Sequence, residues 1–374
     1  MFYELKRQIE YFLKNKIYMA SLIIAAIAGY GYEITHSSLG IDDVCIGLYF
    51  DDGLGVSIGR WPFYVINKIF HVTEFEPFIL EFIAVLIFMF AAIVWSAMLK
   101  YVLGDRLPIA CYAVFSAMFL DYSLIAEVFI YYLQNGVPAI YTLTGVAIFD
   151  FYYLYTHTLE RKQRIWHKLG MSLMVSVAIG FYEAAANVFL TGVLLLMIVD
   201  CFAAAHMGIR RFKPFFLTLF LAGRILVYAI LERSVITRIC MAVFGIQQYS
   251  YRSAGSMLRI LKYPGRILTI IRQILRDYVF VGLAYYPIGL FVVASILFVI
   301  IILAAAVKKR NVYILFLGIL CYGSIFILSL PQGDALPYRS NLMIALLVAM
   351  VLFCLTYLIL NSRYRLVNVV GMIL

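Results

Sequence analysis

The sequence predicts an all-α polytopic membrane protein with about ten transmembrane helices. Of its 374 residues, 65% are hydrophobic and only 13% are charged, and the mean hydropathy is +0.96. Soluble proteins carry roughly 25% charged and 45–50% apolar residues, so a soluble core could not bury this excess. The composition excludes a cytosolic enzyme, a disordered protein and a disulfide scaffold. We treat residues 1–374 as a single membrane domain.

Long apolar runs set the predicted spans, because a transmembrane helix needs about 20 mostly apolar residues. The predicted spans are 17–35, 78–99, 107–125, 137–156, 169–182, 184–205, 214–231, 279–307, 311–330 and 341–360. The fifth and sixth share one apolar stretch that breaks at Phe181-Tyr182-Glu183. The first span lacks a cleavage site and is expected to be an anchor rather than a signal peptide.

The distribution of positive charge predicts the orientation. Most of the 30 Lys and Arg residues fall in short segments on one side of the predicted spans. The positive-inside rule makes that side cytoplasmic, together with both termini. The net charge of +10 is therefore expected to reflect cytoplasmic loops and not nucleic-acid binding.

Two long segments are predicted on the outer side, and their charges are opposite. The external acidic loop, residues 36–77, contains Asp42, Asp43, Asp51, Asp52, Glu74 and Glu76 against Arg60 and Lys68. The external basic segment, residues 232–278, contains Arg233, Arg238, Arg252, Arg259, Lys262, Arg266, Arg272 and Arg276 against Glu232 and Asp277. This pairing predicts that the chemistry takes place on the outer side.

The acidic loop holds two candidate sites. Asp42 and Asp43 stand among apolar residues, and a carboxylate in a partly apolar cleft can act as a general base. The alternative is a solvated loop. In Gly59-Arg60-Trp61, Arg60 offers a planar fork for a phosphate or sugar hydroxyls. Trp61 is suited to stacking on a sugar, and the alternative is an ordinary anchor at the membrane interface.

The basic segment predicts an amphipathic helix that lies flat in the outer interface. Arg259, Lys262 and Arg266 recur at helical spacing between apolar residues, with a predicted break at Pro264-Gly265. Attraction to anionic headgroups would explain basic residues on this side. Nonspecific docking on anionic lipid and a specific lipid-phosphate site both remain open.

Charged groups inside a bilayer are costly and are usually paired or functional. Arg224 lies mid-span and is expected to form a structural ion pair, and other mid-span charges are scarce. Tyr182, Glu183 and Arg339 stand at the outer face and are site candidates. The histidines and cysteines show no metal-ligand spacing, so no metal site is predicted.

Three motifs follow one another from the end of the first span: Gly31-Tyr32-Glu33, Ile41-Asp42-Asp43 and Gly59-Arg60-Trp61. This order resembles the serotype-converting O-antigen glucosyltransferases of bacteria and their phages, which belong to the GT-C class of membrane glycosyltransferases. Tyr182-Glu183 resembles a later Tyr-Gln step of that family, with Glu in place of Gln. Pro337-Tyr338-Arg339-Ser340 resembles its Pro-x-Arg-Ser segment.

The resemblance implies a GT-C-like fold and an inverting transfer on the periplasmic face of the bacterial inner membrane. The donor would be an undecaprenyl-phosphate-linked hexose, with glucose preferred, and the acceptor a lipid-linked polysaccharide such as O-antigen. We predict Asp42 or Asp43 as the general base, with Asp43 slightly preferred for its place in the motif. The donor-binding candidates are Arg60, Trp61, Tyr182, Glu183, Arg259, Lys262, Arg266 and Arg339. Membrane lipids are the other expected partners. No cofactor is expected to be obligatory, because arginine alone can neutralise a monophosphate. A divalent metal is compatible with this expectation but is not predicted.

Two alternatives remain at this point. An O-antigen ligase or polymerase would take a diphosphate-linked donor and rely on external Arg and His, but the outer loops offer only His36 and His71. A flippase or transporter for a lipid-linked sugar would line its mid-membrane spans with charged residues.

Overall fold

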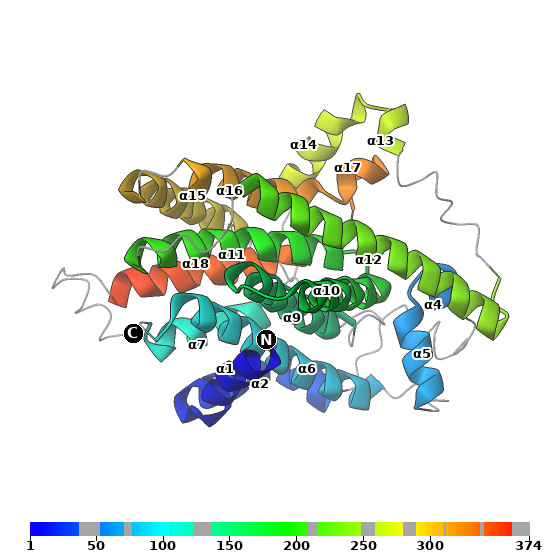
Figure 1. The fold of residues 1–374 in the computed structure, drawn as a ribbon, viewed down its shortest axis with the longest axis horizontal. Coiled ribbons are helices and arrows are strands. Elements are labelled where there is room, and N and C mark those ends of the chain that lie inside the picture. Colours follow the sequence, from blue (N-terminus) through cyan, green and yellow to red (C-terminus); the bar gives the residue numbers. More distant parts are fainter. Residues whose placement is uncertain are drawn as a thin grey trace.

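The computed structural model describes residues 1–36, 53–70, 77–105, 107–122, 136–207, 215–247, 259–279, 289–309, 312–336 and 340–360. Within these ranges every regular element is helical and no strand occurs, so the all-α prediction is confirmed. The helices are α1 (Phe2–Lys14), α2 (Lys16–Thr35), α4 (Leu54–Ser57), α5 (Trp61–Ile69), α6 (Pro77–Leu103), α7 (Ile109–Leu120), α9 (Gly136–Thr156), α10 (Arg161–Phe181), α11 (Ala185–Met207), α12 (Phe215–Phe244), α13 (Arg259–Lys262), α14 (Arg266–Val279), α15 (Leu290–Lys309), α16 (Tyr313–Gly323), α17 (Ser329–Gln332) and α18 (Met343–Leu360) (Figure 1).

Each predicted span overlaps a described helix, but fewer helices meet the requirements for a membrane span. Within the described residues, five are long and apolar enough: Ile79–Leu103, Gly136–Thr156, Leu290–Val307, Tyr313–Gln332 and Met343–Leu360. A sixth is added if α1 and α2, which meet at 80°, count as one broken span. The number of about ten spans therefore stays a prediction.

Several boundaries differ from the sequence prediction. Helix α12 continues to Phe244, well into the segment predicted as the external basic loop. The span predicted at 279–307 begins instead at Leu290, because residue 279 ends α14. The fifth and sixth spans are separate helices that part between Phe181 and Ala185. The predicted break at Pro264-Gly265 is confirmed, since it separates α13 from α14.

Buried polar side chains join the central helices. The Tyr18 hydroxyl on α2 lies 3.1 Å from Ser96 Oγ on α6 and 2.7 Å from Ser116 Oγ on α7. Trp95 Nε1 donates to the carbonyl oxygen of Tyr141 on α9 at 3.0 Å, and the Tyr141 hydroxyl donates to the Leu342 carbonyl at 2.6 Å. These bonds hold α6, α9 and the start of α18 in fixed relation, as buried polar groups require partners.

Besides Arg224, carboxylates also lie within the predicted spans. Asp150 and Asp200 are buried within predicted spans. Asp150 Oδ1 lies 2.5 Å from His167 Nδ1 on α10, and Asp200 accepts a hydrogen bond from the Tyr152 hydroxyl at 2.8 Å. The sequence shows these carboxylates but not their partners, which lie on other helices that the fold brings beside them.

The expected ion pair of Arg224 is corrected. Its side chain is exposed on α12, and its Nη2 atom donates to the Tyr228 hydroxyl, one helical turn along, at 3.1 Å. Its guanidinium also lies over the rings of Phe220 and Tyr228. An aromatic neighbourhood on the same helix thus replaces the carboxylate that the sequence analysis expected.

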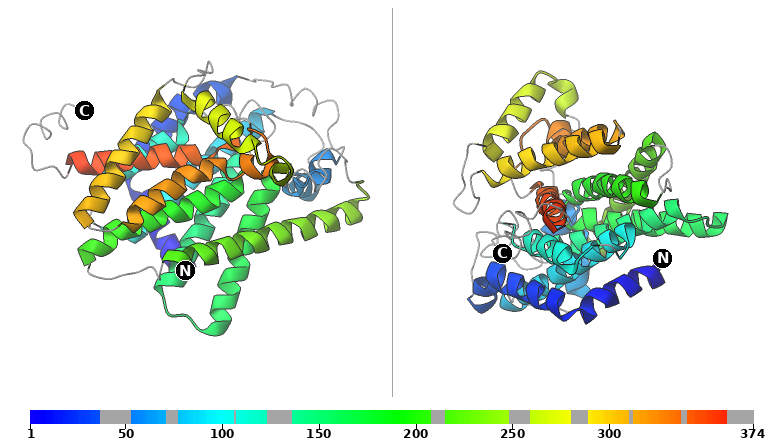
Figure 2. Two further views of the ribbon diagram at one scale, coloured as in Figure 1. Left: turned by 90° about the horizontal axis from the view of Figure 1, so that it is seen from above. Right: turned by 90° about the vertical axis from the view of Figure 1, so that its left-hand side faces the viewer.

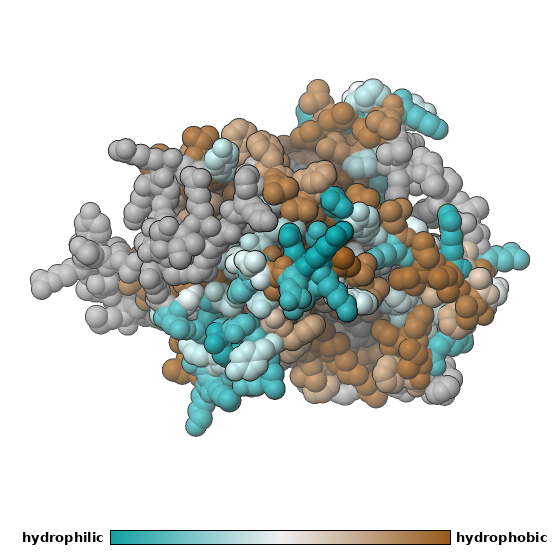
Figure 3. Space-filling view, in the orientation of Figure 1, coloured by the Kyte–Doolittle hydropathy of each residue, from teal (hydrophilic) through white to brown (hydrophobic). Residues whose placement is uncertain are grey.

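Large apolar side chains cover much of the outside of the bundle. On α12 alone, Phe216 is 76% exposed and Val243 is 70% exposed, and Figure 3 shows broad hydrophobic areas on one face. Soluble monomers rarely expose apolar patches of such extent. The apolar helices and this surface fit a protein that lies in a membrane.

Candidate functional site

Two arginines from distant parts of the chain meet at one carboxylate. Arg60 Nη2 lies 3.7 Å from Glu183 Oε2, and Arg233 Nη2 lies 3.3 Å from Glu183 Oε1. The side chains of Arg60, Glu183 and Arg233 are 21%, 13% and 12% exposed, respectively. We call these three residues and Tyr182 the arginine cluster. It lies where α5, the corner between α10 and α11, and the second half of α12 come together (Figure 1).

Gly59 lets Arg233 approach the backbone in front of α5. Arg233 donates from Nε to the Gly59 carbonyl at 3.3 Å and from Nη2 to the Ile58 carbonyl at 3.4 Å. Gly59 has φ +88°, and a Cβ atom there would lie 2.5 Å from Arg233 Nη2. Only glycine accepts that conformation without strain and also leaves the space open. The Gly-Arg-Trp motif therefore has a structural reason for its glycine.

The Tyr182 ring stacks on Arg60, and the Tyr182 hydroxyl connects the cluster to the residues just before α18. The guanidinium carbon of Arg60 lies 4.9 Å from the centre of the Tyr182 ring, which is a cation–π contact. The Tyr182 hydroxyl is hydrogen-bonded to Ser340 Oγ at 2.7 Å. Helix α10 ends at Phe181, and Tyr182 has extended backbone, so the corner directs Tyr182 and Glu183 toward the cluster.

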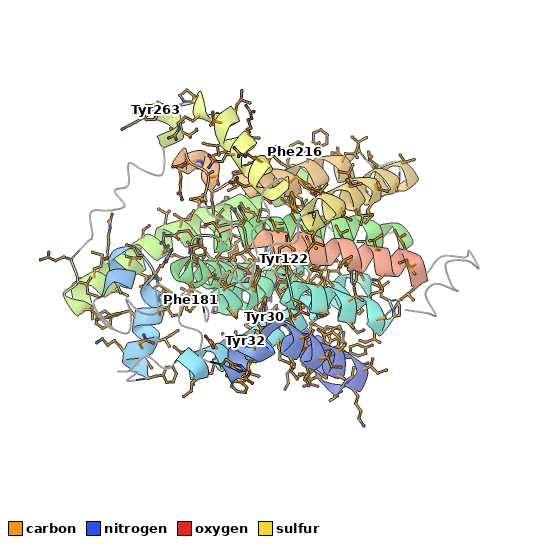
Figure 4. All side chains as sticks on the ribbon, turned by 180° about the vertical axis from the view of Figure 1, so that it is seen from behind. Tyr30, Tyr32, Tyr122, Phe181, Phe216 and Tyr263 are labelled. Carbon is orange, nitrogen blue, oxygen red and sulfur yellow. The ribbon has the colours of Figure 1, made fainter. Side chains whose placement is uncertain are left out.

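Helix α5 is fixed against the end of α10 by close packing. A Cβ atom added at Gly180 would lie 2.9 Å from both Trp61 Nε1 and Pro62 Cγ. The rings of Phe63 and Phe181 meet edge to face with centres 5.1 Å apart, and Figure 4 shows Phe181 beside α5. The position of Arg60 thus depends on the absence of a side chain at Gly180.

Three buried polar groups at this corner have no hydrogen-bond partner among the residues that the structure describes. They are Arg60 Nε, Trp61 Nε1 and the side-chain amide of Asn187. Buried donors and acceptors are rarely left unpaired in native proteins, and each one calls for an explanation. Arg60 and Trp61 supply hydrogen-bond donors, so they suit an acceptor-rich ligand such as a phosphate or a sugar.

The structure brings together some of the predicted site residues and separates others. Arg60, Tyr182 and Glu183 lie in the cluster, with Trp61 beside it. Lys262 and Arg266 belong to α13 and α14, which pack on α15 and α17 and lie apart from α5 (Figures 1 and 2). Asp42, Asp43, Arg339 and the side chain of Arg259 lie outside the described residues.

Arg233 and Asn187 are candidate site residues that the sequence analysis did not single out. Arg233 was counted only as one of many charges in the basic segment, because hydropathy falls at Glu232. The helical pattern that continues past Glu232 was the signal that could have identified Arg233. Helix α12 extends beyond Arg233 and packs against α4. Asn187 is a single polar residue in an apolar run, and nothing in its spacing singled it out.

The electrostatics of the cluster favour an anion. Two guanidinium groups share the Glu183 carboxylate among the residues that the structure describes. Arginine presents donors in a planar fork that matches phosphate oxygens. Because the two arginine side chains are poorly exposed, their attraction to a bound anion is stronger than it would be between the same charges in water. The arrangement can therefore hold a phosphate and stabilise negative charge that develops on it.

Comparison with known protein families identifies a match over most of the chain. The family described as Glucosyl transferase GtrII has a model that matches residues 31–363, which include every residue of the arginine cluster. No curated protein and no solved structure matches the chain.

Proposed function

The chain belongs to the glucosyl transferase GtrII family, and from this premise we propose the donor, the site and the chemistry of its reaction. Membership makes it a glycosyltransferase that acts on O-antigen, so neither the transporter nor the ligase and polymerase alternatives are kept. The finer proposal is that the sugar comes from undecaprenyl phosphate and is transferred with inversion on the periplasmic face of the inner membrane, with both termini in the cytoplasm.

The single observation that carries this proposal is the pairing of Arg60 and Arg233 with Glu183. A polyprenyl-phosphate sugar has one phosphodiester charge in the bound state and a second charge on the phosphate as the sugar leaves. Two poorly exposed guanidinium groups stabilise the second charge more than the first. We assign Arg60 to the phosphate, with Tyr182, Glu183 and Arg233 holding it in place and Trp61 beside the sugar.

The proposed reaction is a direct displacement at the anomeric carbon. An acceptor hydroxyl attacks that carbon, the bond to the phosphate oxygen breaks, and the polyprenyl phosphate leaves with the electron pair. A carboxylate takes the proton of the attacking hydroxyl, and we propose Asp42 or Asp43 for this role. Because guanidinium groups can neutralise the departing phosphate, the proposed mechanism does not require a metal. Lys262, Arg259, Arg266 and Arg339 stay candidates for contact with the lipid or its phosphate.

A transfer assay tests this proposal. Purified protein would be incubated with synthetic polyprenyl-phosphate glucose and lipid-linked O-antigen acceptors, beside the Asp42→Asn and Asp43→Asn variants. We expect glucose transfer by the wild type and its loss in one variant whose thermal unfolding is unchanged. Full transfer by both variants would overturn the assignment of the base. Failure of the wild type with this donor, but success with a nucleotide sugar, would overturn the assignment of the donor.

A further inference from the structure

Asn187 has a buried side-chain amide that the proposed phosphate site does not use. The residue is 0% exposed, and neither Nδ2 nor Oδ1 has a hydrogen-bond partner among the described residues. Its backbone N–H is satisfied by the Ala184 carbonyl at 3.0 Å, so the side chain alone is unpaired. A buried amide without a partner destabilises the folded state, which suggests that this side chain serves a ligand.

The position of Asn187 relates it directly to the arginine cluster. It lies in the first turn of α11, four residues after Glu183, which stands in the turn just before that helix. Thr191 follows after four more residues, and its hydroxyl donates to Ser324 Oγ at 2.7 Å. Glu183, Asn187 and Thr191 thus follow one another at four-residue intervals from the turn before α11 into the helix, where Asn187 and Thr191 share one face. The first has charged partners, the last has a neutral one, and Asn187 lies between them.

The chemistry of the amide indicates what it binds. A primary amide offers both a donor and an acceptor, as a sugar hydroxyl does. A phosphate diester offers acceptors only, and a polyprenyl chain offers neither. One helical turn rises about 5.4 Å, which is similar to the width of a hexose ring. This size would allow a sugar whose phosphate contacts Arg60, beside Glu183, to present a ring hydroxyl to Asn187 four residues further along the chain.

We propose that Asn187 is a specificity-determining residue that hydrogen-bonds one hydroxyl of the transferred hexose. This inference rests on the proposed function, because it places the sugar of the polyprenyl-phosphate donor one turn from the phosphate. A site built to bind a hydroxyl discriminates strongly against a sugar that lacks it, because its own buried polar groups then stay unpaired. Asn187 would accordingly contribute to the choice of hexose.

The test uses the full-length protein with polyprenyl-phosphate glucose and its 2-, 3-, 4- and 6-deoxy derivatives. The variants are Asn187→Leu, which keeps the volume but removes both polar atoms, and Thr191→Val as a matched control on the same face. We expect the wild type to use one deoxy donor about tenfold less efficiently in kcat/KM than glucose. Asn187→Leu should lose about tenfold on glucose itself and no longer distinguish that deoxy donor.

Thermal unfolding separates this role from a structural one. Because Asn187→Leu removes an unpaired buried amide, its Tm should equal or exceed that of the wild type. Thr191→Val breaks a satisfied hydrogen bond, so its Tm should fall while its ratios among donors stay as in the wild type. An Asn187→Leu variant that loses activity equally on all donors, or loses Tm, would overturn the inference alone. Failure of the wild type to use any polyprenyl-phosphate donor would overturn the proposed function and the inference with it.

Discussion

Arg60 and Arg233 approach the two carboxylate oxygens of Glu183 separately, at 3.7 Å from Oε2 and 3.3 Å from Oε1. Glu183 therefore connects the loop before α5 to the second half of α12. Removing one member of such a poorly exposed group leaves the charge of the others uncompensated, which costs more than an exposed pair is worth. The cluster should accordingly respond as a unit to substitution.

Replacement of Glu183 tests this unit. In Glu183→Gln an amide oxygen can still accept a bond from one arginine, so kcat/KM for transfer should fall by no more than about threefold. Glu183→Ala removes the acceptor of Arg233 and the counter-charge of Arg60, so it should lower kcat/KM at least about tenfold. Transfer kinetics of both variants beside the wild type give the answer. Equal effects of Gln and Ala would show that Glu183 does not hold Arg233 by hydrogen bonding.

Replacement of Arg60 tests the assignment of the phosphate ligand. Arg60→Lys keeps the charge but loses the planar fork and the stacking on Tyr182, and Arg60→Ala loses both charge and fork. We expect donor KM to rise in the order wild type, Lys, Ala, by about tenfold or more for Ala, since a charged hydrogen bond contributes about 1.5–3 kcal/mol. The control is Arg161→Ala. Arg161 is the first residue of α10, at the end of that helix far from the cluster, so this variant should leave donor KM unchanged.

Gly59 and Gly104 form a matched pair of glycines that tests whether a side chain at position 59 would displace Arg233. Both have positive φ, +88° and +74°, but a Cβ atom would meet Arg233 Nη2 at 2.5 Å only at Gly59 and no described atom within 4 Å at Gly104. Each alanine substitution should cost about 1 kcal/mol of stability from strain alone. Gly59→Ala should additionally lower transfer by about tenfold or more, because it displaces Arg233. Similar transfer by the two variants would argue against the importance of that contact.

Gly180 and Gly170 provide the corresponding test on α10. A Cβ atom at Gly180 would press on Trp61 and Pro62, whereas at Gly170 no described atom lies within 4 Å. Gly170→Ala should therefore raise stability by about 0.5–1 kcal/mol, as expected for glycine in a helix. Gly180→Ala should lower both the Tm and transfer, because α5 and Arg60 would have to move. A stabilised Gly180→Ala variant with normal transfer would contradict the packing of α5 described above.

The sequence was sufficient to predict the helices because long apolar runs and their breaks are local features. The end of α10 and the start of α14 fall where Phe181-Tyr182-Glu183 and Pro264-Gly265 predicted interruptions. The end of α12 was misplaced because hydropathy falls at Glu232-Arg233, although the helix continues. Hydropathy reports where a helix leaves an apolar environment, and not where the helix itself ends.

The site was only partly accessible from sequence for a different reason. Arg60, Tyr182 and Glu183 stood out because of their motifs and their place at predicted span ends. Arg233 and Asn187 became visible only when the fold placed α12 against α4 and left the Asn187 amide without a described partner. Such pairings depend on tertiary contacts, which one sequence does not encode in any short pattern. The assignment of Asp42 and Asp43 stays a prediction from sequence.

The most direct test of the central claim, that the arginine cluster binds the phosphate of the donor, is competitive inhibition by sugar-free polyprenyl monophosphate. The account predicts that this carrier competes with the donor in the wild type, and that its inhibition constant rises about tenfold or more in Arg60→Ala. The constant should stay unchanged in Arg161→Ala. An unchanged inhibition constant in a folded Arg60→Ala variant would contradict the claim.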